Sequence, residues 1–219
     1  MQEINLEEVV SRVMARLLGG TDDGIPVEMS ARHVHLSKKD ALELFGSELT
    51  PVRELSQPGQ YLCSERVRLI GPKGVMDNVA VLGPSRDESQ VEISLTDART
   101  LGIKVPIRQS GDIGGTPGII LSSATKIIGL ERGVIVAGRH IHMSPEDAER
   151  LNVEDRQLVS VNMEGKRPAG FRDVLVRVHP DFRLALHIDA DEANGCGCDS
   201  STRCRILGPE TEASCRLPS

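Results

Sequence analysis

Short runs of Val, Ile and Leu recur along most of the chain, separated by Gly, Pro and Asp. Runs of this length, bounded by turn residues, predict β-strands rather than long helices. We expect strands at residues 66–70, 79–82, 90–95, 118–121, 134–137, 158–161 and 174–178. Many short strands with turns between them predict a mainly β fold, either barrels or a sandwich, with only brief helices.

The two ends of the chain follow other patterns. Apolar residues between Ile4 and Leu18 recur at helical spacing, which predicts an amphipathic helix followed by a Gly/Asp-rich linker up to residue 24. This helix could fold back onto the body, or it could dock its apolar stripe in a partner's groove. Residues 25–194 form the predicted body, and the Gly-, Ser- and Cys-rich residues 195–219 form a predicted tail.

Composition narrows the class of protein. The net charge is −6 and only 2% of residues are aromatic, so the chain lacks the basic surface and stacking platforms of a nucleic-acid binder. The sequence has no apolar run long enough to span a membrane and does not open with a signal-peptide pattern. We therefore expect a soluble, cytoplasmic protein.

The cysteines gather at the end of the chain. Four of the five are Cys196, Cys198, Cys204 and Cys215, which argues against a disulfide framework for the body. Two interpretations of this Cys-rich tail stay open. It could bind a further metal ion, or it could form a mobile, redox-sensitive segment.

The body contains an internal repeat. RHVHLSKKDALEL at residues 32–44 matches RHIHMSPEDAERL at residues 139–151, and VEISLTDA at 91–98 matches LHIDADEA at 186–193 more loosely. The second match aligns Glu92 with His187. Two blocks recurring in the same order predict a duplicated unit and two pseudo-symmetric halves.

Each copy carries a His-x-His pair at the end of a predicted strand. Residues 25–31 alternate between apolar and polar, and His33 and His35 continue the apolar parity. His140 and His142 follow residues 134–138 in the same way. Residues two apart on a strand point to the same face, so both imidazoles of a pair can bind one ion.

Duplication supplies a third ligand for each pair. The predicted triads are His33/His35/Glu92 and His140/His142/His187. Three nitrogen or carboxylate ligands with an open fourth position are typical of catalytic zinc, although Co²⁺, Mn²⁺ and Fe²⁺ also accept such ligands.

Residues around the triads suggest where an anion could bind. Ser37 and Ser144 each precede a predicted helix start in a Ser-x-x-Asp pattern, and a helix N-terminus can hold an anion such as phosphate. Arg86, six residues before Glu92, is either a surface charge or an anion ligand. His179 lies in a predicted turn before Pro180, where we expect it to be solvated.

Several motifs resemble the PduL-type phosphate acyltransferases. They are RHVHLS, LSQPGQ, GPKG, VLGP-x-R, QVEISLTDA, SGD-x4-PG, RHIHMSPEDA and HIDADEAN, in this order. The resemblance implies an enzyme that interconverts acyl-CoA and phosphate with acyl-phosphate and CoA, using two zinc ions per chain. It also implies two β-barrels capped by short helices, one built from residues 25–31 and 140–194 and the other from residues 32–139.

The resemblance also assigns roles to residues. It implies that the His33/His35/Glu92 zinc holds the CoA sulfur, and that the His140/His142/His187 zinc binds phosphate together with Arg86. Ser30 and Arg53 match positions associated with CoA binding, whereas Ala80 departs from a position that is often basic. No serine or cysteine nucleophile with a partnering base is evident, so we expect direct transfer without an acyl-enzyme.

The same resemblance implies partners and a location. Members from bacterial microcompartments carry an amphipathic N-terminal extension that targets them to the protein shell, and homodimers are common. Two other functions remain open from the residues alone: a metal-dependent hydrolase of thioesters or acyl-phosphates, and a non-catalytic zinc-stabilised module. Which acyl chain is preferred does not follow from these motifs.

Overall fold

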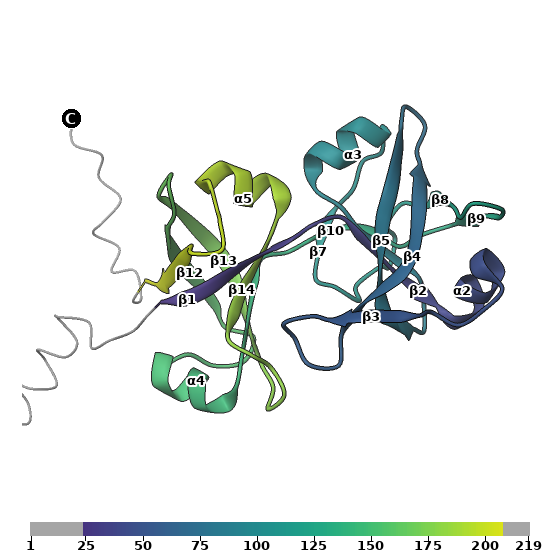
Figure 1. Cartoon of the computed structure of the whole chain (residues 1–219). Coiled ribbons are helices and arrows are strands. Elements are labelled where there is room, and N and C mark those ends of the chain that lie inside the picture. The colour runs from purple at the N-terminus through teal and green to yellow at the C-terminus, as the bar shows by residue number, and fades with distance from the viewer. Residues whose placement is uncertain (1–23, 208–219) are drawn as a thin grey trace, which may run out of the picture.

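A computed structural model describes residues 24–207. They form two β units, seen on the left and right of Figure 1, with four short helices. The mainly β class predicted from the sequence is therefore confirmed. The predicted amphipathic helix at residues 4–18 lies outside the described residues.

The first unit is a closed barrel of six strands. Their order around the barrel is β1-β14-β11-β13-β12-β15. The strands are β1 (Ile25–Ser30), β11 (His140–Met143), β12 (Leu158–Glu164), β13 (Ala169–Val178), β14 (Ala185–Asp189) and β15 (Arg203–Ile206).

The second unit is a nine-stranded sheet in the order β7-β10-β6-β2-β5-β4-β8-β9, with β3 paired to β4. Its strands are β2 (His33–Ser37), β3 (Pro51–Glu54), β4 (Tyr61–Ile70), β5 (Val75–Arg86), β6 (Gln90–Glu92), β7 (Ile107–Arg108), β8 (Ile119–Ser122), β9 (Ile127–Leu130) and β10 (Val134–Ala137).

The expectation of two β-barrels is confirmed in part: the first unit is a closed barrel, whereas the second is a curled sheet that stays open because its edge strands β7 and β9 do not pair. One edge strand, β7, has only two residues. It is followed by a stretch rich in Gly and Pro, residues 111–118, before β8 begins. Glycine weakens a strand and proline removes a ladder donor, so this stretch cannot extend the sheet to close it.

The four helices begin at polar caps. They are α2 (Lys38–Phe45), α3 (Leu95–Leu101), α4 (Pro145–Leu151) and α5 (Ala190–Cys196). The hydroxyl oxygens of Ser37 and Ser144 accept hydrogen bonds from the backbone N–H groups three residues later, which confirms both predicted helix starts. Ser94 likewise caps α3, so the strand expected over 90–95 ends at Glu92.

The chain crosses between the units near the candidate ligands. Strand β1 pairs in parallel with β14 and antiparallel with β15, so it belongs to the barrel. The chain then enters the other unit at His33, the first residue of β2, and returns between β10 and β11. Each His-x-His pair therefore begins where the chain has just crossed.

Part of the predicted Cys-rich tail lies in the barrel. Strand β15 pairs with both β1 and β12, and Cys196 and Cys204 are buried in the barrel core. The Sγ atoms of Cys196 and Cys198 are 3.5 Å apart. Apolar residues in this part of the chain complete the barrel, which composition alone did not indicate. Cys215 lies outside the described residues.

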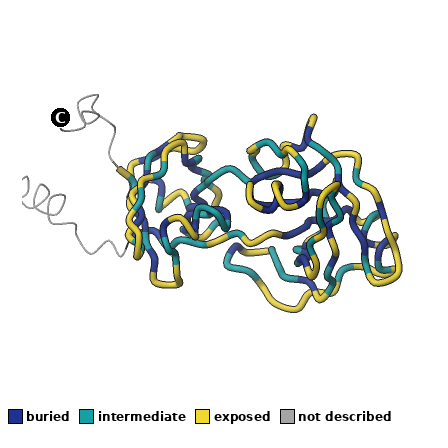
Figure 2. Tube along the Cα trace, turned by 90° about the horizontal axis from the view of Figure 1, so that it is seen from above, coloured by how far each residue is buried: buried dark blue, intermediate teal, exposed yellow. Residues whose placement is uncertain are grey.

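Each unit has its own hydrophobic core. One core centres on residues such as Leu36, Leu69 and Val81, and the other on residues such as Ile141 and Val161, all of them fully buried. Figure 2 shows buried positions running through the middle of both units. Two separate cores leave room for a polar site between the units, where the crossing strands begin and end. None of the helices in the described range could span a membrane.

Candidate functional site

The first predicted triad is brought together by strand pairing. His33 and His35 lie on β2, and the antiparallel pairing of β2 with β6 places Glu92 opposite His33. Glu92 Oε2 is 3.5 Å from His33 Nε2, and Oε1 is 4.0 Å from His35 Nε2. One nitrogen or oxygen atom from each of the three side chains lies within 4.8 Å of the others.

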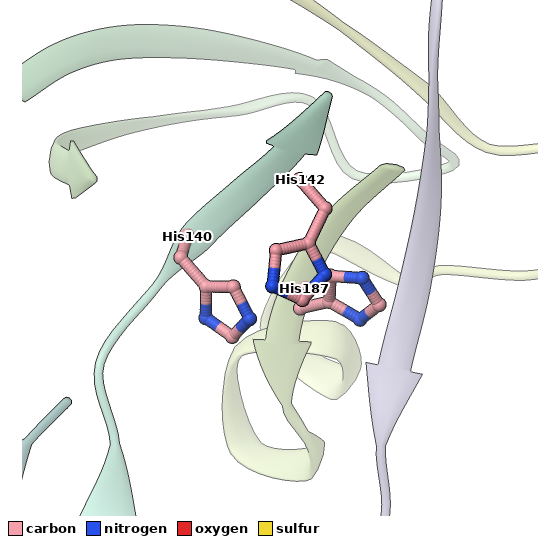
Figure 3. A group of neighbouring side chains, drawn as sticks. All are labelled: His140, His142 and His187. Carbon is pink, nitrogen blue, oxygen red and sulfur yellow. The ribbon is translucent and has the colours of Figure 1, made fainter. Parts of the chain in front are cut away.

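The second predicted triad has the same construction. His140 and His142 lie on β11, and β11 pairs antiparallel with β14 so that His187 is opposite His140. The three rings converge in Figure 3, with centroids 4.7–5.0 Å apart. Glu92 and His187 thus occupy matching register positions in the two copies. The repeat is therefore present in three dimensions at the level of individual side chains.

Backbone carbonyls orient the first histidine of each pair. His33 Nδ1 donates to the carbonyl of Ala31 at 2.8 Å, and His140 Nδ1 donates to the carbonyl of Gly138 at 2.9 Å. A carbonyl only accepts hydrogen bonds, so the proton is assigned to Nδ1 and the lone pair to Nε2. This arrangement is typical of metal-binding histidines.

Other ring nitrogens have no hydrogen-bond partner within the described residues. They are the two nitrogens of His142. His142 is only 5% exposed and its ring packs 4.1 Å from that of Phe182. Buried polar atoms are normally paired, so unpaired nitrogens inside a cluster of three imidazoles fit a site that receives a cation.

Burial keeps three of the imidazoles neutral, those of His35, His142 and His187. Burial, together with repulsion from the neighbouring histidines, lowers the pKa of His142 to about 2 and that of His187 to about 3. Burial also lowers the pKa of His35 to about 3, with added repulsion from His33 and Arg86. A neutral imidazole offers its lone pair to a metal ion, so these pKa values favour ligation at neutral pH.

Glu92 is held as a carboxylate. Burial alone would raise its pKa, but His33 and His35, the Ser110 hydroxyl and Arg86 together lower it to about 2. Its Oε1 atom accepts hydrogen bonds from Ser110 Oγ at 2.8 Å and Gln90 Nε2 at 2.6 Å. The charged carboxylate makes the first triad more attractive to a cation than three neutral ligands would be.

Both triads open into one cavity of about 830 Å³. All six triad residues line it, together with the predicted site residues Arg86, Ser30 and Arg53. The cavity therefore combines two potential cation sites with cationic side chains that could hold an anion.

Arg86 contacts the first triad directly. Its Nη2 lies 2.8 Å from His35 Nε2, and its Nη1 donates to Ser110 Oγ at 3.0 Å. Burial lowers the pKa of Arg86 and the nearby Arg177 lowers it further, while Glu92 raises it. A guanidinium has no acceptor, so His35 Nε2 accepts this hydrogen bond and is unprotonated.

Two further lining residues were missed by the sequence analysis. Arg177 on β13 lies beside His142 in the parallel pairing of β13 with β11, and Gln57 lies 3.5 Å from His187 Nε2. The sequence did offer a signal for Arg177, because it is a charged residue between Val176 and Val178 in a predicted strand. His179 does not line this cavity, and its half-exposed side chain faces Asp181 at 3.6 Å.

The sequence is similar to those of several known proteins. A family model described as phosphate propanoyltransferase matches residues 26–199. A phosphate propanoyltransferase of Sebaldella termitidis is 52% identical over 204 residues, covering 92% of this chain and 97% of the relative. Those of Salmonella typhimurium and Thermotoga maritima are 52% and 55% identical, covering 84% and 79% of this chain and 90% and 84% of the relatives.

Proposed function

The chain belongs to the phosphate propanoyltransferase family, and from this premise we propose that it transfers a short acyl group between CoA and phosphate at a two-zinc site. The observation that carries the proposal is the shared cavity, which is lined by both triads and by Arg86 and Arg177. Acyl transfer between two soluble substrates requires both to be held side by side, and a single cavity with two cation sites meets that need.

The two triads are the proposed zinc ligands. Neutral imidazole nitrogens, with one carboxylate in the first triad, suit a borderline metal such as Zn²⁺, and three ligands leave a position open for substrate. When bound, zinc would stabilise negative charge that develops on the reacting sulfur and oxygen atoms.

The cationic side chains are proposed to hold the anionic substrates. Arg86 and Arg177 line the cavity near the triads, and guanidinium groups bind phosphate oxygens through paired N–H donors. Ser30, at the end of β1, and Arg53, on β3, line the same cavity. We propose that these two residues bind CoA, whose phosphate groups also need hydrogen-bond donors.

The reaction is proposed to proceed by direct transfer. A phosphate oxygen forms a bond to the thioester carbonyl carbon, the carbon–sulfur bond breaks, and CoA leaves as a thiolate. No cysteine lines the cavity among the described residues, so an acyl-enzyme, if one formed, would have to be on a serine or a carboxylate. Mass spectrometry of protein quenched during turnover with acyl-phosphate would reveal an acylated residue if this step is wrong.

The activity can be tested by thiol release from acetyl-CoA and propionyl-CoA, with and without phosphate, on protein of known metal content. The proposal expects CoA release that requires phosphate and yields acyl-phosphate. Release at the same rate without phosphate would indicate a hydrolase instead. The ratio of the rates with acetyl-CoA and with propionyl-CoA, both in the presence of phosphate, measures the acyl preference.

We also propose a location and an assembly state. The family resemblance suggests that residues 1–24 target the chain to a microcompartment shell and that the body forms a homodimer. Deleting residues 1–20 should leave transferase activity intact and abolish encapsulation of a fused reporter. Light scattering on purified protein tests the dimer.

A further inference from the structure

Each His-x-His strand is tied to the helix that follows its third ligand. Arg32, directly before His33, donates from Nε and Nη2 to the carboxylate of Asp97 at 3.1 and 2.7 Å. Asp97 lies in the first turn of α3 and forms a capping box with Ser94. The helix begins three residues after Glu92. This ion pair therefore links the strand that carries His33 and His35 to the segment that carries Glu92.

The second copy repeats this link. Arg139, directly before His140, donates from Nε to Glu192 Oε1. Glu192 lies in the first turn of α5 and forms a capping box with Asp189. In the aligned repeat Asp97 corresponds to Glu192, and each carboxylate lies five residues after the third ligand of its triad. The two links are therefore equivalent parts of the duplicated unit.

Asp191 connects the two copies. Its carboxylate accepts a hydrogen bond from the Thr96 backbone N–H at 2.8 Å and another from Ser94 Oγ at 3.1 Å. The Thr96 N–H belongs to the first turn of α3, where no intrahelical acceptor exists. Burial alone would raise the pKa of Asp191, but the hydrogen bonds from Thr96 and Ser94 lower it. In the repeat, Asp191 aligns with Thr96 itself.

The contact joins two helices that belong to different units (Figure 1). Helix α5 follows β14, which carries His187, and α3 follows β6, which carries Glu92. A displacement of α5 relative to α3 would therefore move one triad relative to the other. Transfer between substrates held at the two triads depends on that separation, because small misplacements of reacting groups are costly.

We propose that Asp191 is a positioning residue that docks α5 on α3 and fixes the separation of the two triads. The inference rests on the proposed function, since it concerns substrates held at both triads. Asp191 lies outside the cavity lining, so it acts through the helices and not on substrate. Its loss should lower the rate of transfer within the bound complex more than it weakens binding of either substrate.

The test compares full-length variants at equal metal content. Asp191→Ala removes the acceptor. Asp191→Thr replaces the carboxylate with a shorter hydroxyl side chain, and Thr96 shows that the equivalent helix turn of the other copy accommodates threonine. Asp191→Asn keeps an oxygen for the Thr96 N–H. The matched control is Asp199→Ala, because Asp199 also accepts from a backbone N–H and a serine hydroxyl, both of Ser201, but only within the barrel.

The first measurement is steady-state acyl transfer from acetyl-phosphate to CoA. We expect Asp191→Ala and Asp191→Thr to lower kcat by about ten- to a hundredfold with KM for both substrates within about twofold, since a misplacement of about 1 Å can cost about a hundredfold in rate. Asp191→Asn should recover most of kcat, and Asp199→Ala should match the unsubstituted chain. Unchanged kcat in Asp191→Ala and Asp191→Thr, or an equal loss in Asp199→Ala, would overturn the proposal.

The second measurement is hydrogen–deuterium exchange, which needs no activity. Exchange in a peptide covering Leu95–Leu101 should rise in Asp191→Ala and stay unchanged in Asp199→Ala. Unchanged exchange in Asp191→Ala would show that Asp191 does not hold α3 in place and would overturn the proposal. If the unsubstituted chain transfers no acyl group, the proposed function fails, while the exchange result still decides whether Asp191 holds α3.

Discussion

The metal-free protein should lose much of its stability between pH 7.5 and pH 5.5. His35, His142 and His187 have folded-state pKa values of about 3, about 2 and about 3 because burial disfavours their charged forms. In the unfolded chain a histidine titrates near 6.5, so the unfolded chain binds these protons first as the pH falls. The stability that comes from keeping the rings neutral is therefore complete above about pH 6.5 and decreases below it.

The size of the loss follows from proton linkage. A group that is protonated only when unfolded destabilises the folded state by about 1.4 kcal/mol per pH unit below its unfolded pKa. At pH 5.5 that is about 1.4 kcal/mol for each of the three histidines, or about 4 kcal/mol together. Domains are usually stable by only about 5–15 kcal/mol, so this is a large fraction. With a urea slope of about 2 kcal/mol per M, the midpoint should fall by roughly 2 M.

The assay is urea unfolding at both pH values in excess chelator, with two variants. His142→Gln removes one titrating ring. Between the two pH values its free energy of unfolding should therefore fall by about 1.4 kcal/mol less than that of the unsubstituted chain. His179→Gln, at an exposed turn position, should lose as much as the unsubstituted chain. Zinc added in place of the chelator should raise the midpoint at both pH values, because metal binds rings that are neutral in the folded state at either pH. Equal midpoints at both pH values, or a full loss in His142→Gln, would refute this reasoning.

Three further predictions concern single side chains. Arg86→Ala should lower kcat for thiol release by about 10²–10³ through loss of a charge stabiliser, with Arg86→Lys recovering only part; a loss below about threefold would contradict its role. Glu92→Gln should reduce bound zinc from two ions per chain to one by elemental analysis, and two retained ions would exclude Glu92 as a ligand. Gln57→Ala breaks two hydrogen bonds to the backbone of Arg183, which should cost about 1–2 kcal/mol and lower Tm by roughly 2–8 °C. Gln60→Ala, in the same loop, is its control in thermal unfolding, and an equal fall in Tm would argue against the Gln57 contacts.

Local rules determined a large part of this protein. Strand parity placed His33 with His35 and His140 with His142, because the alternation of side chains depends only on the extended backbone. Helix starts at Ser37 and Ser144 followed from side chains that cap neighbouring N–H groups. The repeat suggested Glu92 and His187 as matching third residues, and the structure brings each to its pair. These features depend on short stretches of sequence, so they could be predicted.

Other features depend on which distant segments pair. The sequence did not show that the second sheet stays open at β7 and β9, or that β15 completes the barrel within the predicted tail. Arg177 and Gln57 reach the cavity only through pairing and loop contacts made across the fold.

The contact of Asp191 with Thr96 depends on the docking of the two units. Register and docking are set by the burial of two complete cores, which involves the whole chain at once. The sequence by itself therefore determined the repeat, the strand-borne histidine pairs and the helix starts. Only the tertiary structure decided how the two copies meet around one cavity.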